Sequence, residues 1–166
     1  MRAVIGRQFG GIGNLSLEDV PSPSLESGTV RISVRAAGIS FANLLFIAGR
    51  HQNRPSLPFI PGTEVAGIVT EIASDARTEL RVGDRACAGL PSGGFAEEAV
   101  VDAANVFKIP DSLSFAGATL FPTIYATAYA GLVWRANLAP GEYLVELKAK
   151  GQGGEAKQLV AFRVTS

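Results

Sequence analysis

Two polar side chains in the first third of the chain are suited to handling a proton or a substrate oxygen. The Ser40 hydroxyl can donate and accept a hydrogen bond, and the His51 imidazole can donate a proton near neutral pH. We predict both as catalytic residues. Each has a simpler alternative, because Ser40 also suits the N-cap of a helix, and His51 lies in a Gly- and Arg-containing loop where solvent could surround it.

Five further side chains are candidates for the wall of a substrate or cofactor cleft: Asn43, Glu64, Tyr125, Thr127 and Tyr129. For Asn43 the alternative is a solvent-exposed amide, and for Glu64 it is a carboxylate that stabilises a turn. The two tyrosines could border a nicotinamide ring, and Thr127 could bind its amide. Their helical spacing fits core packing equally well.

Composition excludes several classes of partner. Fifteen Lys and Arg residues balance fifteen Asp and Glu residues, whereas a broad nucleic-acid surface would be basic. No apolar run approaches the ~20 residues of a membrane span, and residues 1–7 lack the apolar core of a signal peptide. We therefore expect no nucleic-acid partner, no membrane partner and a cytoplasmic location. The single cysteine, Cys87, excludes an internal disulfide and a cysteine metal cluster, and we expect it to be a small buried apolar side chain.

Short strands separated by turns are expected over much of the chain, which contains 19 Gly and nine Pro residues. Residues 30–36 alternate apolar and polar side chains, as a half-buried strand does. Further strands are expected at 64–73, 85–88, 95–101 and 106–109. A helix is expected at 40–49, another at 115–121 after Ser114, and a third from Pro122 to about 137–141. This pattern predicts a fold that is mainly β with a few helices and that forms a barrel.

The final segment, 143–166, differs in composition, since three of the four lysines lie in the last 19 residues. Residues 143–149 and 158–164 are typical of strands, and the glycines at 151–154 favour a hairpin between them. The spacing from Gly151 to Ala156 also fits a dinucleotide phosphate turn, but such a turn needs a following helix and a second strand. We favour the hairpin, and we predict that its strands complete the barrel of the same chain or of a partner chain.

Several motifs occur in one order along the first 142 residues: Gly38-Ile-Ser-Phe-Ala-Asn-Leu-Leu45, Pro58-Phe-Ile-Pro-Gly-Thr-Glu-Val-Ala-Gly-Ile-Val69, Val82-Gly-Asp-Arg85, Gly93-Gly-Phe-Ala-Glu97, Ile109-Pro-Asp111, Thr127-Ala-Tyr129 and Leu138-Ala-Pro-Gly-Glu142. With these motifs, residues 1–142 resemble the GroES-like catalytic domain of the medium-chain dehydrogenase/reductase superfamily. The nearest branch is the zinc-independent, zeta-crystallin-like quinone oxidoreductases. The resemblance implies a partly open β-barrel that packs against a Rossmann domain. In full-length members, NADPH passes hydride to a quinone or an α,β-unsaturated carbonyl in the cleft between the two domains.

Two positions depart from the zinc-dependent members of this superfamily. Those members carry a Cys near position 40 and a His at position 63, where this chain has Ser40 and Thr63. Zinc prefers thiolate, imidazole or carboxylate ligands, and the four-cysteine zinc lobe is also missing, so we predict no metal site. The quinone oxidoreductase branch often carries Asn at position 40 and tyrosines near Leu45 and His51, so substrate contacts should differ here.

Two functions are consistent with these observations. The first is the substrate-side domain of a zinc-independent, NADPH-dependent quinone or enone oxidoreductase, which is inactive and binds no cofactor by itself because no complete Rossmann domain is expected. The alternative is a non-catalytic barrel that serves as a binding, scaffold or chimeric folding module, so whether the chain alone is an enzyme stays open. We also expect a homo-oligomer formed through the former interdomain face, and a quinone-like small molecule as ligand.

Overall fold

Two compact units make up the chain, one formed by residues 1–125 and the other beginning at residue 126. The computed structural model describes residues 1–139, 141–151 and 154–164. This boundary lies 17 residues before the division between residues 142 and 143 that the sequence predicts.

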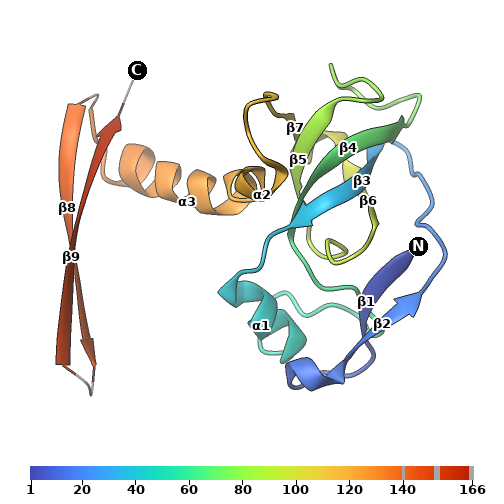
Figure 1. Ribbon diagram of the computed structural model, residues 1–166, viewed down its shortest axis with the longest axis horizontal. Coiled ribbons are helices and arrows are strands. Elements are labelled where there is room, and N and C mark those ends of the chain that lie inside the picture. The colour runs from blue at the N-terminus through green and yellow to red at the C-terminus, as the bar shows by residue number, and fades with distance from the viewer. Residues whose placement is uncertain (140, 152–153, 165–166) are drawn as a thin grey trace. The chain divides into compact units, whose positions relative to one another are not determined.

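The first unit is built on a curled antiparallel sheet of five strands (Figure 1). Their order across the sheet is β6 (Glu98–Asp102), β3 (Thr29–Ala37), β4 (Glu64–Ile72), β5 (Arg85–Gly89) and β7 (Val106–Lys108). The strands expected at 30–36, 64–73, 85–88 and 106–109 are confirmed within one or two residues. The expected strand at 95–101 begins later, at Glu98.

The late start of β6 follows from a hairpin that sequence patterning did not reveal. This hairpin pairs β1 (Arg2–Gly6) with β2 (Leu15–Asp19), and the 3₁₀ turn η1 (Ile12–Asn14) lies between them. Val4 N donates to Phe95 O at 2.9 Å, and Glu97 N donates to Arg2 O at 3.1 Å. The segment before β6 therefore pairs with β1, and the whole forms the mainly β, half-barrel fold that was predicted.

The core lies inside the curl of the sheet, where Val30, Ile32, Val65 and Val69 are fully buried. Burying each such side chain favours folding by about 1.5–3 kcal/mol relative to exposure. Strands β3 and β4 approach closely at Gly67, where an added Cβ would lie 2.0 Å from the Ser33 carbonyl oxygen. Glycine at this position is therefore a packing requirement of the β3–β4 pair.

One arginine side chain links three strands on the outer face of the sheet. The Arg31 guanidinium on β3 bonds to Glu71 of β4 at 3.0 Å and to Glu98 of β6 at 3.1 Å. Its side chain is only 15% exposed. One arginine thus bridges the two strands that flank it.

Short helices follow the predicted capping residues. Helix α1 (Phe41–Ile47) begins after Ser40, and the chain leaves it through Gly49 at φ +67°. The 3₁₀ turn η2 (Ala103–Asn105) joins β6 to β7. Helix α2 (Phe115–Ala118) is capped by the Ser114 hydroxyl, which accepts from Gly117 N at 3.1 Å. This helix is shorter than predicted, since a π-helical segment, η3 (Phe121–Tyr125), continues the chain.

The second unit contains α3 (Ala126–Tyr129), the π-helical η4 (Ala130–Arg135) and two long strands. Strands β8 (Gly141–Gly151) and β9 (Gly154–Val164) pair antiparallel along their whole length, from Gly141 opposite Val164 to Gly151 opposite Gly154. They are longer than the predicted 143–149 and 158–164, and turn residues 152–153 lie outside the described residues. Their pairing with a barrel stays a prediction.

Candidate functional site

A small polar network at the start of α1 contains Ser40 and Asn43, two of the predicted site residues. The Ser40 backbone N–H donates to Asn43 Oδ1 at 2.8 Å, and the Ser40 hydroxyl approaches the same oxygen at 3.3 Å. Asn43 Nδ2 donates to Thr63 Oγ1 at 3.4 Å. The network therefore joins the cap of α1 to the residue that precedes β4.

Helix α1 buries the Asn43 amide along with Ile47, whereas apolar side chains in its first turn are exposed, which departs from the usual pattern of a surface helix. Asn43 is 1% exposed, whereas Phe41 is 73% exposed and Leu44 is 48% exposed. Ile39, just before the cap, is 83% exposed. The alternative of an exposed Asn43 amide is wrong, and the exposed apolar residues on both sides of Ser40 are typical of a ligand-binding wall.

The Glu64 side chain is more deeply buried than a carboxylate that stabilises a surface turn would be. It is 2% exposed, and among the described residues its Oε1 atom is buried without a hydrogen-bond partner. Gly38 packs directly against it, because a Cβ at Gly38 would lie 2.7 Å from Glu64 Oε2. A role for Glu64 at the cleft stays a prediction.

His51 is held in place more firmly than a solvated loop residue. Its ring stacks on Phe46 with centroids 3.9 Å apart, and its Nδ1 atom accepts from Asn53 N at 3.1 Å. Because Nδ1 accepts, the ring proton of the neutral imidazole is assigned to Nε2. His51 is therefore positioned as an Nε2–H donor.

The three candidates near the unit boundary all lie on the surface. Tyr125, in the first unit, stacks on Phe121 with centroids 4.6 Å apart. Thr127 and Tyr129 belong to the second unit, and the Tyr129 ring contacts Trp134 edge to face at 6.0 Å. None of the residues in 121–135 is buried, and their role in a cleft stays a prediction.

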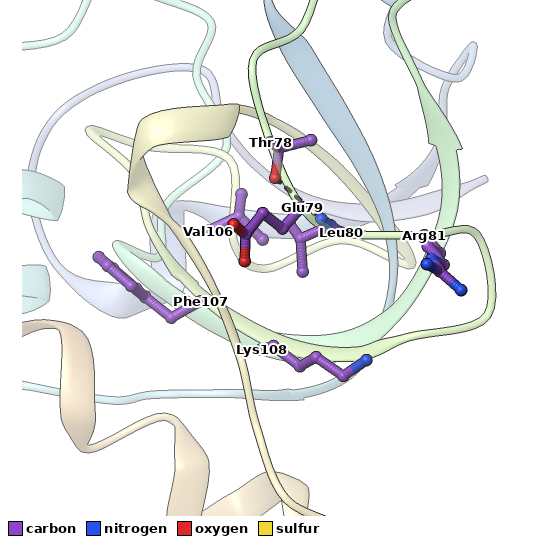
Figure 2. A pocket seen from close by; sticks show the side chains of 7 residues that line it. All are labelled: Thr78, Glu79, Leu80, Arg81, Val106, Phe107 and Lys108. Atoms are coloured by element: carbon purple, nitrogen blue, oxygen red, sulfur yellow. Dashed lines mark hydrogen bonds between the residues drawn. The ribbon is translucent and has the colours of Figure 1, made fainter.

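An open pocket of about 870 Å³ lies at β7 and the loop before β5, away from every predicted site residue (Figure 2). Figure 2 shows Arg81 and Phe107 at opposite ends of it. Lys108 Nζ, on its rim, binds Asp84 Oδ1 at 2.6 Å. This bond and the Arg81 backbone N–H lower the pKa of Asp84. Lys108 is thus already paired with a carboxylate at the rim of the pocket.

Metal and thiol chemistry find no support in the described ranges. No group of three His, Cys, Asp or Glu side chains gathers there in a way that would hold a metal ion. Cys87 is buried on β5, and its burial raises the pKa of the thiol, so it is the predicted apolar core residue rather than a nucleophile. Within the same ranges, no helix has both the length and the apolar character of a membrane span.

A curled antiparallel half-barrel with one capped helix beside its polar network defines a GroES-like domain. The model of the alcohol dehydrogenase GroES-like domain matches residues 26–111, and the chain belongs to this family. Within the medium-chain dehydrogenase/reductase superfamily, it falls in the quinone oxidoreductase and VAT-1 branch.

Three relatives illustrate this placement. The quinone oxidoreductase-like protein 2 homolog of Nematostella vectensis is 40% identical over 165 residues, covering 98% of this chain and 44% of the relative. The human synaptic vesicle membrane protein VAT-1 homolog-like structure has a TM-score of 0.80 at 36% identity, covering 85% of this chain and 45% of that one. The Thermus thermophilus quinone oxidoreductase, also solved with NADPH, has a TM-score of 0.72 at 37% identity, covering 86% and 43%. This chain therefore spans less than half the length of these relatives.

The described residues that follow 152–153 extend a strand and do not begin a helix. A phosphate turn leads from a strand into a helix whose N-terminus meets the phosphate. Here β9 begins at Gly154 and pairs back on β8. NADPH is bound in a solved complex of the Thermus thermophilus relative, and residues 154–156 do not form the helix start that such a phosphate site uses.

Thr63 belongs to the polar network at the start of α1, although the sequence pointed to it only as the position where zinc-dependent members carry a His ligand. Its hydroxyl contacts the Asn43 amide across 20 positions of sequence. Its place directly before the buried strand β4 was the available signal, because a polar residue at the end of a core strand is often a site residue.

Proposed function

We propose that this chain forms the substrate-side wall of a zinc-independent, NADPH-dependent quinone or enone oxidoreductase that works in the cytoplasm. The observation that carries the proposal is the buried Asn43 amide, which bonds to the Ser40 and Thr63 hydroxyls, with exposed apolar residues on both sides of Ser40. A quinone is a flat apolar ring with carbonyl oxygens, and such a ligand needs an apolar wall with a few fixed donors.

The candidate site residues other than Glu64 each have a task in this proposal. Phe41 and Leu44 contact the ring, and the hydroxyl network and His51 Nε2–H supply hydrogen bonds to its oxygens. Tyr125, Thr127 and Tyr129 belong to the surface that meets the cofactor domain. By itself the chain binds and orients an acceptor, and turnover requires a nicotinamide domain that fixes the cofactor against it.

Ligand titration tests this proposal directly. We expect duroquinone, whose four methyl groups block Michael addition, to shift the NMR methyl signals of Ile39 and Leu44 saturably. Durene has the same methylated ring without the oxygens and should bind at least about threefold more weakly, since a hydrogen bond contributes about 0.5–1.5 kcal/mol. No saturable shift, or shifts confined to Val106 and Leu80 of the open pocket, would contradict the proposal.

We also propose that, when no cofactor domain covers them, the exposed rings of α3 and η4 in the second unit join two copies of the chain. Tyr129 is 57% exposed and Trp134 is 74% exposed, although both are large apolar rings. An exposed face of this kind marks an interaction surface, which a second copy of the chain can cover.

Light scattering tests this assembly. We expect a mass at least twice that of the 17.3 kDa chain. The double variant Tyr129→Ser/Trp134→Ser should return the monomer mass. The control Ile12→Ser, at a position in the first unit that is 68% exposed, should leave the assembly unchanged. A monomeric parent chain at high concentration would refute self-assembly.

A further inference from the structure

The orientation of the Asn43 amide is fixed by a group that can only donate. The Ser40 backbone N–H points at the amide at 2.8 Å, so the atom facing it must be the oxygen. The Asn43 nitrogen then faces Thr63 Oγ1. Since Asn43 is 1% exposed, solvent does not compete for these bonds.

This orientation sets the direction of both hydroxyls. Ser40 Oγ lies 3.3 Å from Asn43 Oδ1, an acceptor, so the Ser40 hydrogen points into the network. The Asn43 nitrogen carries only hydrogens, so Thr63 Oγ1 must accept from it at 3.4 Å. The Thr63 hydroxyl hydrogen therefore points away from Asn43. In the part of the chain that the structure describes, it donates to no protein group.

We propose that the Thr63 hydroxyl is the hydrogen-bond donor to the carbonyl oxygen of the substrate, and that the Ser40 backbone N–H and the Asn43 amide position this hydroxyl. This inference rests on the proposed function and names the contact atom. Thr63 is partly exposed, whereas Glu64 and Val65 directly after it are buried at the start of β4. A donor at the end of a packed strand keeps its position when a ligand arrives.

Substitutions at positions 40 and 63 can distinguish a Thr63 donor from a Ser40 donor. In Ser40→Ala the backbone N–H of residue 40 remains, so Asn43 keeps its orientation and Thr63 keeps its free hydrogen. In Thr63→Val the shape is retained but the donor is lost. Thr63→Ser restores the hydroxyl on a smaller side chain.

Duroquinone labelled with ¹³C at its carbonyls is the probe. In the parent chain and Thr63→Ser, we expect one carbonyl signal to move downfield on binding and the affinities to agree within about twofold. In Ser40→Ala we expect the downfield shift to be retained, with a smaller loss of affinity than in Thr63→Val. In Thr63→Val we expect no downfield shift and about three- to tenfold weaker binding, which corresponds to one lost hydrogen bond. Thr63→Ala carries the same expectation and replaces the valine variant if that variant does not fold.

Each outcome has one meaning. A parent chain that binds no duroquinone contradicts both the proposed function and this inference. Unchanged affinity and carbonyl shift in Thr63→Val overturn the inference alone. Loss in Ser40→Ala with retention in Thr63→Val assigns the donor to Ser40 instead.

Discussion

Replacing Gly67 by alanine is expected to lower the free energy of unfolding of the first unit by a large part of its total. The new Cβ would lie 2.0 Å from the Ser33 carbonyl oxygen and 2.9 Å from Ile32 Cγ2. Both neighbours belong to β3, the strand that pairs with β4 and β6 on its two sides. Because backbone cannot rotate away as a flexible side chain can, the strands must separate, at a cost of about 3 kcal/mol or more. Domains of this size have a free energy of unfolding of only about 5–15 kcal/mol.

Thermal and urea unfolding measure this effect, and Gly13→Ala is its matched control. Gly13 lies in η1 with nothing within 4 Å of its added Cβ. We expect the control to change the free energy of unfolding by less than about 0.5 kcal/mol. Equal stability of the two variants would show that β3 and β4 do not approach as described.

Asn43→Leu is expected to destabilise the protein although it places an apolar residue in a buried helix position. Leucine has the higher helix propensity, by about 0.5 kcal/mol, so propensity alone predicts a gain. The substitution removes the acceptor of the Ser40 N–H and the donor to Thr63 Oγ1. Leaving such groups unpaired costs about 1–3 kcal/mol, so the net effect is a lower free energy of unfolding.

The control for this variant is the reverse exchange one position along the same helix. Leu44 is 48% exposed, so Leu44→Asn should stay within about 0.5 kcal/mol of the parent chain. Urea unfolding of both variants measures these differences in the free energy of unfolding. An Asn43→Leu chain as stable as the parent would show that the hydrogen bonds of Asn43 do not stabilise the fold.

Sequence patterning predicted the elements whose cause is local. Strand β4 is rich in β-branched residues, and α1 has a serine at its start and a glycine beyond its end. The β1–β2 hairpin was missed because its strands are short and its stabilising partners lie near residues 59 and 95–97. Long-range pairing of this kind leaves no periodic signal in the segment itself.

The same distinction applies to the candidate site. The cap role of Ser40, the alternative to a catalytic role, was predictable because a cap is a local motif, and the start of α1 confirms it. The catalytic role of Ser40 stays a prediction. The burial of Asn43 was not predicted, because the hydroxyl that compensates it belongs to Thr63, 20 positions away. The tyrosines at 125 and 129 were placed by helical spacing, which does not distinguish a core face from a surface face.

The contact between Gly38 and Glu64 also limits the order in which this sequence can evolve. A Cβ at position 38 would lie 2.7 Å from Glu64 Oε2, so a side chain there requires the buried carboxylate to move. A lineage that replaces the glycine is therefore expected to change the conformation or the length of the side chain at position 64 as well. We expect the two positions to be epistatic, with substitutions at position 38 better tolerated once Glu64 has been replaced.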